Sequence, residues 1–351
     1  MIEFTGVAET RGWFTEPGPE NDVVLASRVR LSRNLDRHHF PGMMKSDEEE
    51  LVQTQILKAI GSLGERYEST VLGQLSPLER RLMLERNLIS QDFSLHSHKA
   101  VFLRSDEQLA GMVNEIDHIR FASLCGGLNL RRAREEVDSV DDVFEEQLDY
   151  AASLNMGYLN TEISNAGTGM RASIMLHLPS LVATSLVEKT FKAVVQLGLS
   201  VKGFFGDDEN SLGCMYQVSN QFGLGFTEEE IIEKLESVAT QIVNYERKAR
   251  DEMVGRQRVD LEDRVYRAFG LLKYCRSISA REAIENLSSL RLGAALGWVD
   301  MPVELITALF FLTQKSHVQQ LIDSGETGAD TKLIDHTRAV MIKEALGNVE
   351  L

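Results

Sequence analysis

A segment of glycines and arginine carries the clearest chemical pattern in the chain. Residues 167–169 read Gly-Thr-Gly, and Arg171 follows two residues later. Glycines take backbone angles that are closed to other residues and can bring main-chain N–H groups close to a bound anion. A planar guanidinium beside them could hold a phosphate through two hydrogen bonds. The segment therefore indicates a phosphate site, and a plain glycine turn between two elements is the alternative.

Two further arginines stand two residues apart in an apolar run. Arg28 and Arg30 lie within residues 23–31, which read as a strand. Successive side chains of a strand point to opposite faces, so both guanidinium groups point to the same side. Neighbouring positive charges repel each other unless an anion or carboxylates lie between them. We interpret the pair as an anion site, with two surface ion pairs as the alternative.

Short strands and helices must position these arginines. Strands are predicted at residues 23–31, 99–104, 109–114, 118–124, 201–204 and 215–219. Residues 172–178 alternate in the manner of a strand with one buried face. Helices are predicted at residues 46–64, 75–90, 137–154 and 180–198, and a long helix begins at Thr227. Only helical segments follow residue 255, so we predict an α+β domain over residues 1–255 and an all-helical domain over residues 256–351.

The composition is that of a soluble globular protein. The 351 residues are 43% hydrophobic and carry a formal net charge of −16. This negative field disfavours direct binding to nucleic acid and favours a basic substrate or partner. The three cysteines, Cys125, Cys214 and Cys275, lie far apart without metal-ligand spacing, which indicates a reducing compartment. We find no long apolar run or signal pattern, so we expect no membrane association and a cytoplasmic location.

Four segments resemble, in order, the motifs of the ATP:guanidino phosphotransferases. The arginine strand corresponds to Ser27–Asn34, the Asn-Glu-Glu-Asp-His-x-Arg motif to Asn114–Arg120, the Asn-x-Gly-Thr-x-x-Arg-Ala-Ser motif to Asn165–Ser173, and the Val-Arg-Gly-x-x-Gly-Glu motif to Val201–Asp207. Order and spacing agree over about residues 20–225. Because the arginine strand begins at residue 23, we expect no helical domain before it, unlike in creatine kinases. With helices after residue 255, the chain is most similar to the bacterial protein-arginine kinases.

This resemblance implies a fold and an activity. The expected fold is α+β, an antiparallel sheet flanked by helices and followed by a smaller all-α domain. The implied reaction transfers a phosphoryl group from ATP, with Mg²⁺, to the guanidinium of arginine residues in proteins. The partner is then a protein substrate or a regulatory protein, and the helical domain implies a homodimer. Ile334–Ala339 resembles a phosphoarginine-reading motif that has lost its leading arginine, and an ordinary packing helix is the alternative.

The matching motif positions imply a clamp for the phosphates of ATP. The clamp residues are Arg28, Arg30, Arg120 and Arg171, and Lys202 replaces the fifth arginine of the family. A lysine keeps the positive charge but loses the two-pronged geometry of a guanidinium. Glu115 is expected near the Mg²⁺ ion and its water ligands. We predict no set of residues that binds a metal directly.

The guanidinium side of the implied site departs from the family pattern at three positions. Ile116 and Glu162 stand where the family has a glutamate and a cysteine, and Asp207 stands where it has a glutamate. A guanidinium is protonated at neutral pH, so carboxylates are needed to orient it and to accept its proton. In one hypothesis Glu162 and Asp207, with Glu115, form the catalytic set. In the other, the clamp belongs to a nucleotide-binding pseudokinase that regulates a partner.

Overall fold

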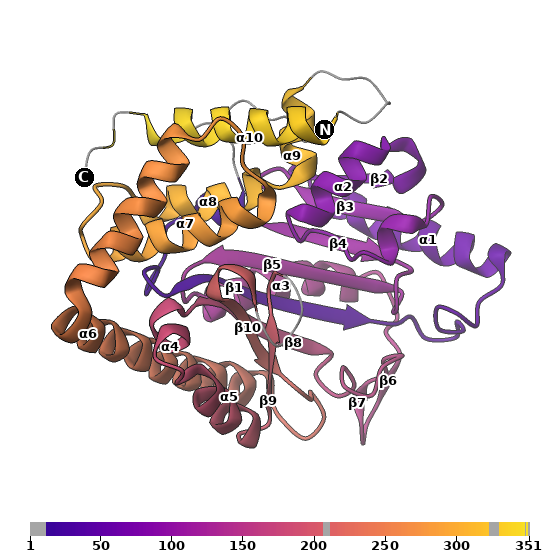
Figure 1. Cartoon of the computed structure of the whole chain (residues 1–351). Helices are drawn as coiled ribbons and strands as arrows, with labels where there is room; N and C mark the ends of the chain where they lie inside the picture. Colours follow the sequence, from indigo (N-terminus) through magenta and orange to yellow (C-terminus); the bar gives the residue numbers. More distant parts are fainter. Residues whose placement is uncertain (1–11, 206–210, 323–329, 348, 350–351) are drawn as a thin grey trace.

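The computed structural model describes residues 12–205, 211–322, 330–347 and 349. An eight-stranded sheet runs through the molecule (Figure 1). In spatial order its strands are β2 Tyr67–Val71, β3 Ala100–Arg104, β4 Leu109–Val113, β5 Ile119–Gly126, β1 Val24–Arg33, β8 Met170–His177, β10 Met215–Asn220 and β9 Leu199–Gly203. Every neighbouring pair is antiparallel, as the sequence predicts, and β1 lies between β5 and β8. A small hairpin pairs β6 Ala152–Ser153 with β7 Gly157–Tyr158.

One face of the sheet packs against helices from the first two thirds of the chain. These helices are α1 Ser46–Ile60, α3 Leu130–Glu145, α4 Pro179–Ala183, α5 Val187–Gln196 and the first half of α6 Glu228–Tyr274. Val29 and Leu31 of β1 and Ile174 of β8 point into this core and are buried. The alternation of the arginine strand therefore sends its apolar side chains to this face and leaves Arg28 and Arg30 on the other.

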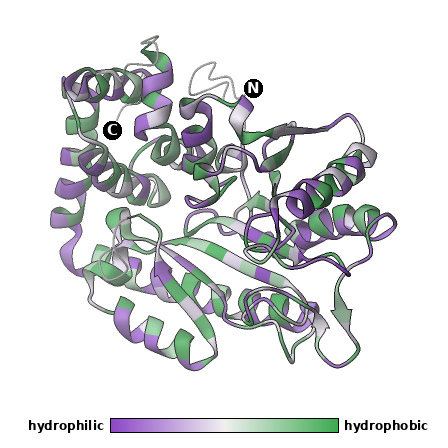
Figure 2. Cartoon of the chain, turned by 90° about the vertical axis from the view of Figure 1, so that its right-hand side faces the viewer, coloured by the Kyte–Doolittle hydropathy of each residue, from purple (hydrophilic) through white to green (hydrophobic). Residues whose placement is uncertain are grey.

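The opposite face is covered at one end by the C-terminal helices. They are α7 Ala280–Ala295, α8 Val303–Leu312, α9 Lys315–Leu321 and α10 Thr331–Leu346, and α2 Pro77–Glu85 lies next to α9. Met175 and His177 of β8 are buried under these helices. The prediction of a single buried face for residues 172–178 was wrong, because helices from the last quarter of the chain cover the second face. In Figure 2 the strands are mainly apolar, and polar positions interrupt them.

Two local predictions were also wrong. The helix expected at residues 137–154 is α3, and it ends at Glu145. It ends there because the chain beyond it pairs with the residues that follow β1. The Asp36 N–H donates to Asp149 O at 2.8 Å, and the Ala151 N–H donates to Asn34 O at 2.7 Å. Strand β2 was missed, since its exposed polar residues give no apolar alternation. Short 3₁₀ turns occur at Trp13–Thr15, Gly61–Leu63, Leu72–Gln74, Phe93–Leu95 and Leu212–Cys214.

Helix α6 joins the sheet to the C-terminal helices. Its start is capped as the sequence predicts, because Glu230 N–H donates to Thr227 Oγ1 at 3.2 Å and the Glu230 carboxylate accepts from Thr227 N–H at 2.7 Å. The helix continues through residue 255, and its backbone departs from helical angles at Gln257, with φ −138° and ψ 38°. No helix in the described part of the chain is long and apolar enough to cross a bilayer.

Candidate active site

The predicted clamp arginines gather on one face of the three central strands. The strand register places Arg30 of β1 directly opposite Arg171 of β8. On the other side of β1, Arg30 pairs with Ala122, so Arg120 lies two residues further along β5 on the same face. Arg28 lies two residues from Arg30 along β1, also on this face. Four guanidinium groups from three strands therefore share one surface, as the motif resemblance implies.

These arginines carry more positive charge than the surrounding protein balances. No ion pair joins Arg28, Arg30 or Arg171 to a carboxylate within the described ranges. The Nε atoms of Arg28, Arg30 and Arg120 are buried, and each lacks a hydrogen-bond partner in the structure. Burial and the nearby Arg120 lower the pKa of Arg28 to about 10, and the same two causes lower the pKa of Arg30. Buried donors without partners are costly, so this face is built to receive an anion.

Glu115 is the carboxylate that lies within the arginine cluster. It forms an ion pair with Arg120, and both side chains are largely buried. Its Oε1 accepts a hydrogen bond from Ser90 Oγ at 2.6 Å, and its Oε2 accepts one from the Ile116 N–H at 3.2 Å. Mg²⁺ in nucleotide sites is held by one or two carboxylates, phosphate oxygens and waters, so a single fixed carboxylate here fits such an ion. No cluster of three His, Cys, Asp or Glu side chains that could hold a metal occurs in the described ranges.

The two glycines of the Gly-Thr-Gly segment allow neighbouring backbone segments to pack closely. Gly167 has φ 96° and Gly169 has φ 65°, both in the left-handed region that favours glycine. A Cβ on Gly169 would lie 2.6 Å from Ser32 O, and one on Gly167 would lie 2.8 Å from the Cα of Leu224. The Gly167 N–H donates to Tyr158 O at 3.2 Å. The hydrogen bond to β7 therefore occupies the Gly167 N–H, and the broader expectation that main-chain N–H groups of this segment face an anion stays a prediction.

Glu162 lies at the edge of the arginine cluster and is exposed to solvent. Its Oε2 accepts a hydrogen bond from Asn165 Nδ2 at 3.2 Å, and Asn165 Oδ1 accepts one from Arg30 Nη2 at 3.4 Å. Arg171 is near enough that the negative charge of Glu162 raises its pKa, against a larger lowering by burial. Asn165 thus joins the clamp to the carboxylate that the sequence places on the guanidinium side.

The segment around Ile116 lies beside the segment that carries Glu162. Thr161 Oγ1 donates to Ile116 O at 2.8 Å, and Thr161 N–H donates to Asp117 Oδ1, also at 2.8 Å. Positions 116 and 162 therefore border the same region although they are far apart in sequence. His118, next in the motif, is structural: its Nδ1 accepts from Leu35 N–H at 2.9 Å, and burial lowers its pKa to about 4.

Of the two remaining predicted site residues, the structure describes only Lys202. Lys202 of β9 is exposed and pairs with Gln217, in the same cross-strand row as Met175 and Ala26. This row lies two residue pairs from the row of Arg28, so the Lys202 backbone is not adjacent to Arg30 or Arg171. Asp207 lies outside the residues that the structure describes.

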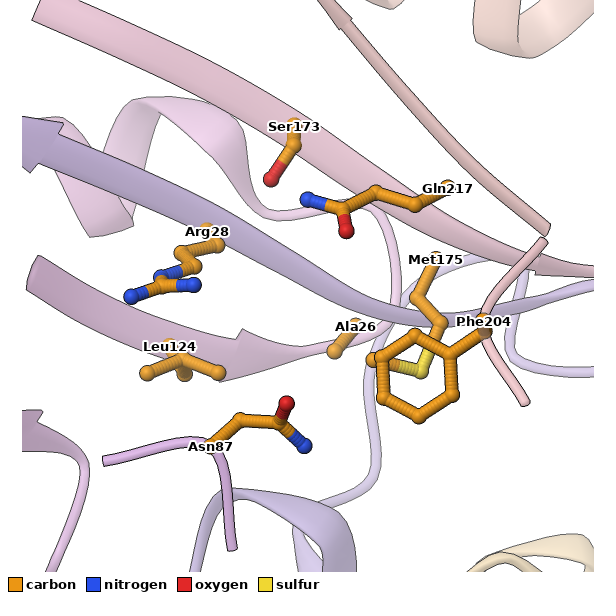
Figure 3. A pocket seen from close by; sticks show the side chains of 8 residues that line it. All are labelled: Ala26, Arg28, Asn87, Leu124, Ser173, Met175, Phe204 and Gln217. Atoms are coloured by element: carbon orange, nitrogen blue, oxygen red, sulfur yellow. The ribbon is translucent and has the colours of Figure 1, made fainter. Parts of the chain in front are cut away.

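A pocket next to Arg28 was not found by sequence reasoning. Its lining residues are Ala26, Arg28, Asn87, Leu124, Ser173, Met175, Phe204 and Gln217. Figure 3 shows Asn87 facing Ser173 and Gln217 across this space, with Leu124, Met175 and Phe204 around it. Asn87 follows α2 and has a positive φ of 57°, a conformation that asparagine adopts more readily than most residues. The pocket combines an apolar lining with two amides and one guanidinium.

Comparison with known proteins agrees with this geometry. A family model described as the C-terminal catalytic domain of ATP:guanido phosphotransferases matches residues 48–249. A second model, described as the C-terminal domain of the protein-arginine kinase McsB, matches residues 258–351. The chain belongs to the ATP:guanido phosphotransferase family. Its buried arginines on a central antiparallel sheet thus occur in a family whose name refers to ATP and guanidino groups.

Several relatives within this family cover nearly the whole chain. A protein-arginine kinase of Bacillus cereus is 38% identical over 340 residues, which are 95% of this chain and 95% of the relative. A protein-arginine kinase of Bacillus licheniformis is 38% identical over 343 residues, which are 95% of this chain and 93% of the relative. These matches extend through the C-terminal helices as well as the sheet.

Solved structures of more distant guanidino kinases share the fold. Lombricine kinase superposes with a TM-score of 0.57 at 20% identity, covering 70% of this chain and 71% of that one. The duplicated taurocyamine kinase of Schistosoma mansoni with bound transition state analog components gives a TM-score of 0.58 at 20% identity, covering 70% of this chain and 34% of that one. The antiparallel guanidino-kinase fold expected from the motifs is therefore confirmed.

The motif in the C-terminal helices has a structural role in this family member. Arg338 of α10 is almost fully buried. Its Nε donates to Thr313 O and its Nη1 donates to Ile278 O, both at 2.7 Å, and it pairs with Asp335 one turn earlier. These contacts join α10 to the end of α8 and to the segment that leads into α7. The guanidinium is thus engaged by the protein itself.

Proposed function

We propose that the protein transfers the γ-phosphoryl group of ATP to the guanidinium of arginine residues in proteins. The observation that carries this proposal is the arrangement of buried arginines around Arg30, with little countercharge, beside the exposed carboxylate of Glu162. The first feature suits a polyphosphate and the second suits a guanidinium. The relatives named protein-arginine kinase support a protein as the substrate.

The triphosphate of ATP binds to Arg28, Arg30, Arg120 and Arg171. The nucleoside extends from the phosphates, and we do not place it in the pocket beside Arg28, because a cavity of about 30 Å³ is too small for a base. Glu115 would hold the Mg²⁺ ion that accompanies ATP, and that ion would supply positive charge to the phosphate oxygens. We assign no phosphate contact to Lys202, because its place on β9 is away from Arg30 and Arg171.

Glu162 orients the substrate guanidinium and accepts its proton. A guanidinium nitrogen forms a bond to the γ-phosphorus while the bond from that phosphorus to the bridging oxygen breaks. ADP leaves, and the proton lost by the nitrogen passes to the Glu162 carboxylate. Asp207 is the proposed second carboxylate, and Ile116 gives an apolar wall where the family has a glutamate. Transfer within a preorganised cluster of positive charge needs few protein groups besides these.

Transfer of labelled phosphate from γ-labelled ATP to an arginine-rich protein tests the proposal. With Mg²⁺ present, we expect an acid-labile label on arginine that is absent for Arg171→Ala. Thermal stabilisation by ATP without any transfer would overturn the kinase assignment. That result would favour a nucleotide-binding regulator, which the isoleucine at position 116 makes the relevant alternative.

A further inference from the structure

Exposed apolar side chains border the carboxylate of Glu162. Ile163, the next residue, is 78% exposed, and Phe222 and Leu224 are 50% and 43% exposed. The Gly223 N–H donates to Ser164 O at 3.2 Å, so the backbone between Phe222 and Leu224 lies against the backbone that follows Ile163. We call Ile163, Phe222 and Leu224 the apolar rim. It combines residues from two segments that are about 60 positions apart in sequence.

Close contacts between two backbone segments fix the position of the apolar rim. A Cβ on Gly167 would lie 2.8 Å from the Cα of Leu224, and one on Gly223 would lie 2.9 Å from Thr168 Oγ1, so the two segments touch closely. Asn220 Nδ2 donates to Phe222 O and to Met170 O, both at 3.2 Å. The segment is therefore tied to the start of β8. Its apolar side chains stay at the surface because the backbone beneath them is fixed, and such rims mark interaction sites.

We propose that the apolar rim binds apolar side chains of the substrate polypeptide, two residues before and after the target arginine. The inference rests on the proposed function, because the arginine itself is placed by Glu162. In an extended segment, side chains at i−2, i and i+2 point to the same face, about 7 Å apart. When the arginine reaches Glu162, its i−2 and i+2 neighbours lie over the adjoining surface.

Charge and continuity favour this occupant over others. A carboxylate beside apolar groups complements a cation beside apolar groups, and the net charge of −16 favours a basic segment. The rim is also continuous with the candidate active site, since Ile163 follows Glu162 directly. The structure thus assigns a substrate preference: arginines in extended segments with apolar residues two positions away on each side.

Two peptides of identical composition test the preference. One carries leucine two residues before and after a single arginine, with serine and glycine elsewhere, and its isomer carries the leucines at the two ends. We expect kcat/KM to be about tenfold higher for the first peptide, which corresponds to ~1.4 kcal/mol. The combined variant Ile163→Ser, Phe222→Ser, Leu224→Ser should lose this ratio and keep its rate on the isomer. Val259→Ser, an equally exposed apolar position on α6, is the matched control and should keep the ratio.

The outcomes separate this inference from the proposed function. If neither peptide is labelled by the parent protein, the proposed function fails. If both are labelled equally, or the triple variant keeps the ratio, the function stands and the rim inference is wrong. Sedimentation tests a further alternative. If the parent self-associates and the triple variant is monomeric, the rim binds a second copy of the chain and the inference about the substrate is wrong. If the triple variant fails to fold, as judged by its melting curve, Phe222→Ser alone is measured and should lower the ratio.

Discussion

Arg30 and Arg171 lie directly opposite each other on adjacent antiparallel strands, and no carboxylate in the described part of the chain forms an ion pair with either. Opposite positions in such a pair are the closest neighbours across the sheet, and like charges there destabilise it. Burial strengthens the repulsion, because partial removal of water leaves the charges less screened. The protein therefore keeps an unfavourable pair at the place where we propose that the phosphates of ATP bind. Binding is favourable in part because the anion relieves this repulsion.

Replacing Arg30 by methionine should stabilise the nucleotide-free protein while weakening ATP binding. The variant removes one of two facing buried charges and keeps most of the side-chain volume, which we expect to add about 1 kcal/mol to the free energy of unfolding. Loss of charged hydrogen bonds to phosphate should weaken ATP binding about 10- to 100-fold. Denaturant unfolding and calorimetry measure the two effects.

Arg267→Met is the matched control for this change. Arg267 is exposed on α6 and pairs with Asp263 one turn earlier, so its replacement should leave both quantities nearly unchanged. A lower stability of Arg30→Met together with unaltered ATP affinity would show that the arginine pair is a structural feature rather than an anion site.

Part of this arrangement follows from sequence alone. Alternation along β1 is enough to place Arg28 and Arg30 on one face, opposite Val29 and Leu31. Sequence alone does not place Arg30 opposite Arg171, because strand register depends on which turns and bulges the chain forms. The alternation of residues 172–178 also could not predict that both faces of β8 are buried, because the helices that cover the second face lie more than 100 residues later in the chain.

The rest of the candidate site depended on contacts between distant segments. The link from Glu162 through Asn165 to Arg30 has no sequence signal beyond the motif spacing, because it is made by side-chain rotamers. Asn87 and Gln217 were missed because isolated amides are common on any surface. For Asn87 one signal was its proximity in sequence to Ser90, whose hydroxyl contacts Glu115, and Gln217 had no such signal.

His118 should make stability fall as the pH decreases. In the unfolded chain this histidine titrates near 6.5, and burial lowers the folded-state pKa to about 4. Between these values the unfolded state binds the extra proton. The contribution is therefore complete above about pH 6.5 and is lost toward pH 4, by about 3 kcal/mol at most.

Urea unfolding between pH 7 and about pH 4.5 checks this linkage. Asparagine can replace the acceptor that receives the Leu35 N–H, so His118→Asn should flatten the pH dependence relative to the parent. Burial also lowers the pKa values of His177 and His317, so a slope of the same sign should remain. His96→Asn, at an exposed position, should leave the slope as it is in the parent. An unchanged slope in His118→Asn would contradict the assignment.

Arg338→Ala should destabilise the C-terminal helices. The change leaves the Thr313 and Ile278 carbonyls and the Asp335 carboxylate without their shared donor, at a cost of about 3 kcal/mol. Denaturant unfolding followed by circular dichroism measures this loss, and Lys332→Ala at the exposed start of α10 is the control. Full stability of Arg338→Ala would instead mean that the guanidinium is available for a ligand such as phosphoarginine.

Glu162→Gln should lower kcat for arginine phosphorylation by about 10²- to 10⁴-fold, the usual effect of losing a general base. Glutamine keeps an oxygen that can accept from Asn165 Nδ2, so the loop geometry and the ATP affinity should be retained. Single-turnover transfer from labelled ATP measures kcat, and calorimetry measures ATP affinity. An unchanged kcat would place the base on another residue.

A glutamate at position 116 should restore part of the activity lost in Glu162→Gln. Ile116 and Thr161 are joined by a hydrogen bond, so a carboxylate introduced at position 116 borders the region that Glu162 serves. We expect Ile116→Glu in the Glu162→Gln background to recover at least about tenfold in kcat, and Ile116→Glu alone to change kcat little, because a base is already present. Ile116→Gln in the same background is the matched control: it adds a polar group of equal size without a proton acceptor of comparable basicity, so it should recover nothing. Equal recovery by glutamine and glutamate would show that polarity or shape, and not proton transfer, limits the reaction at this position.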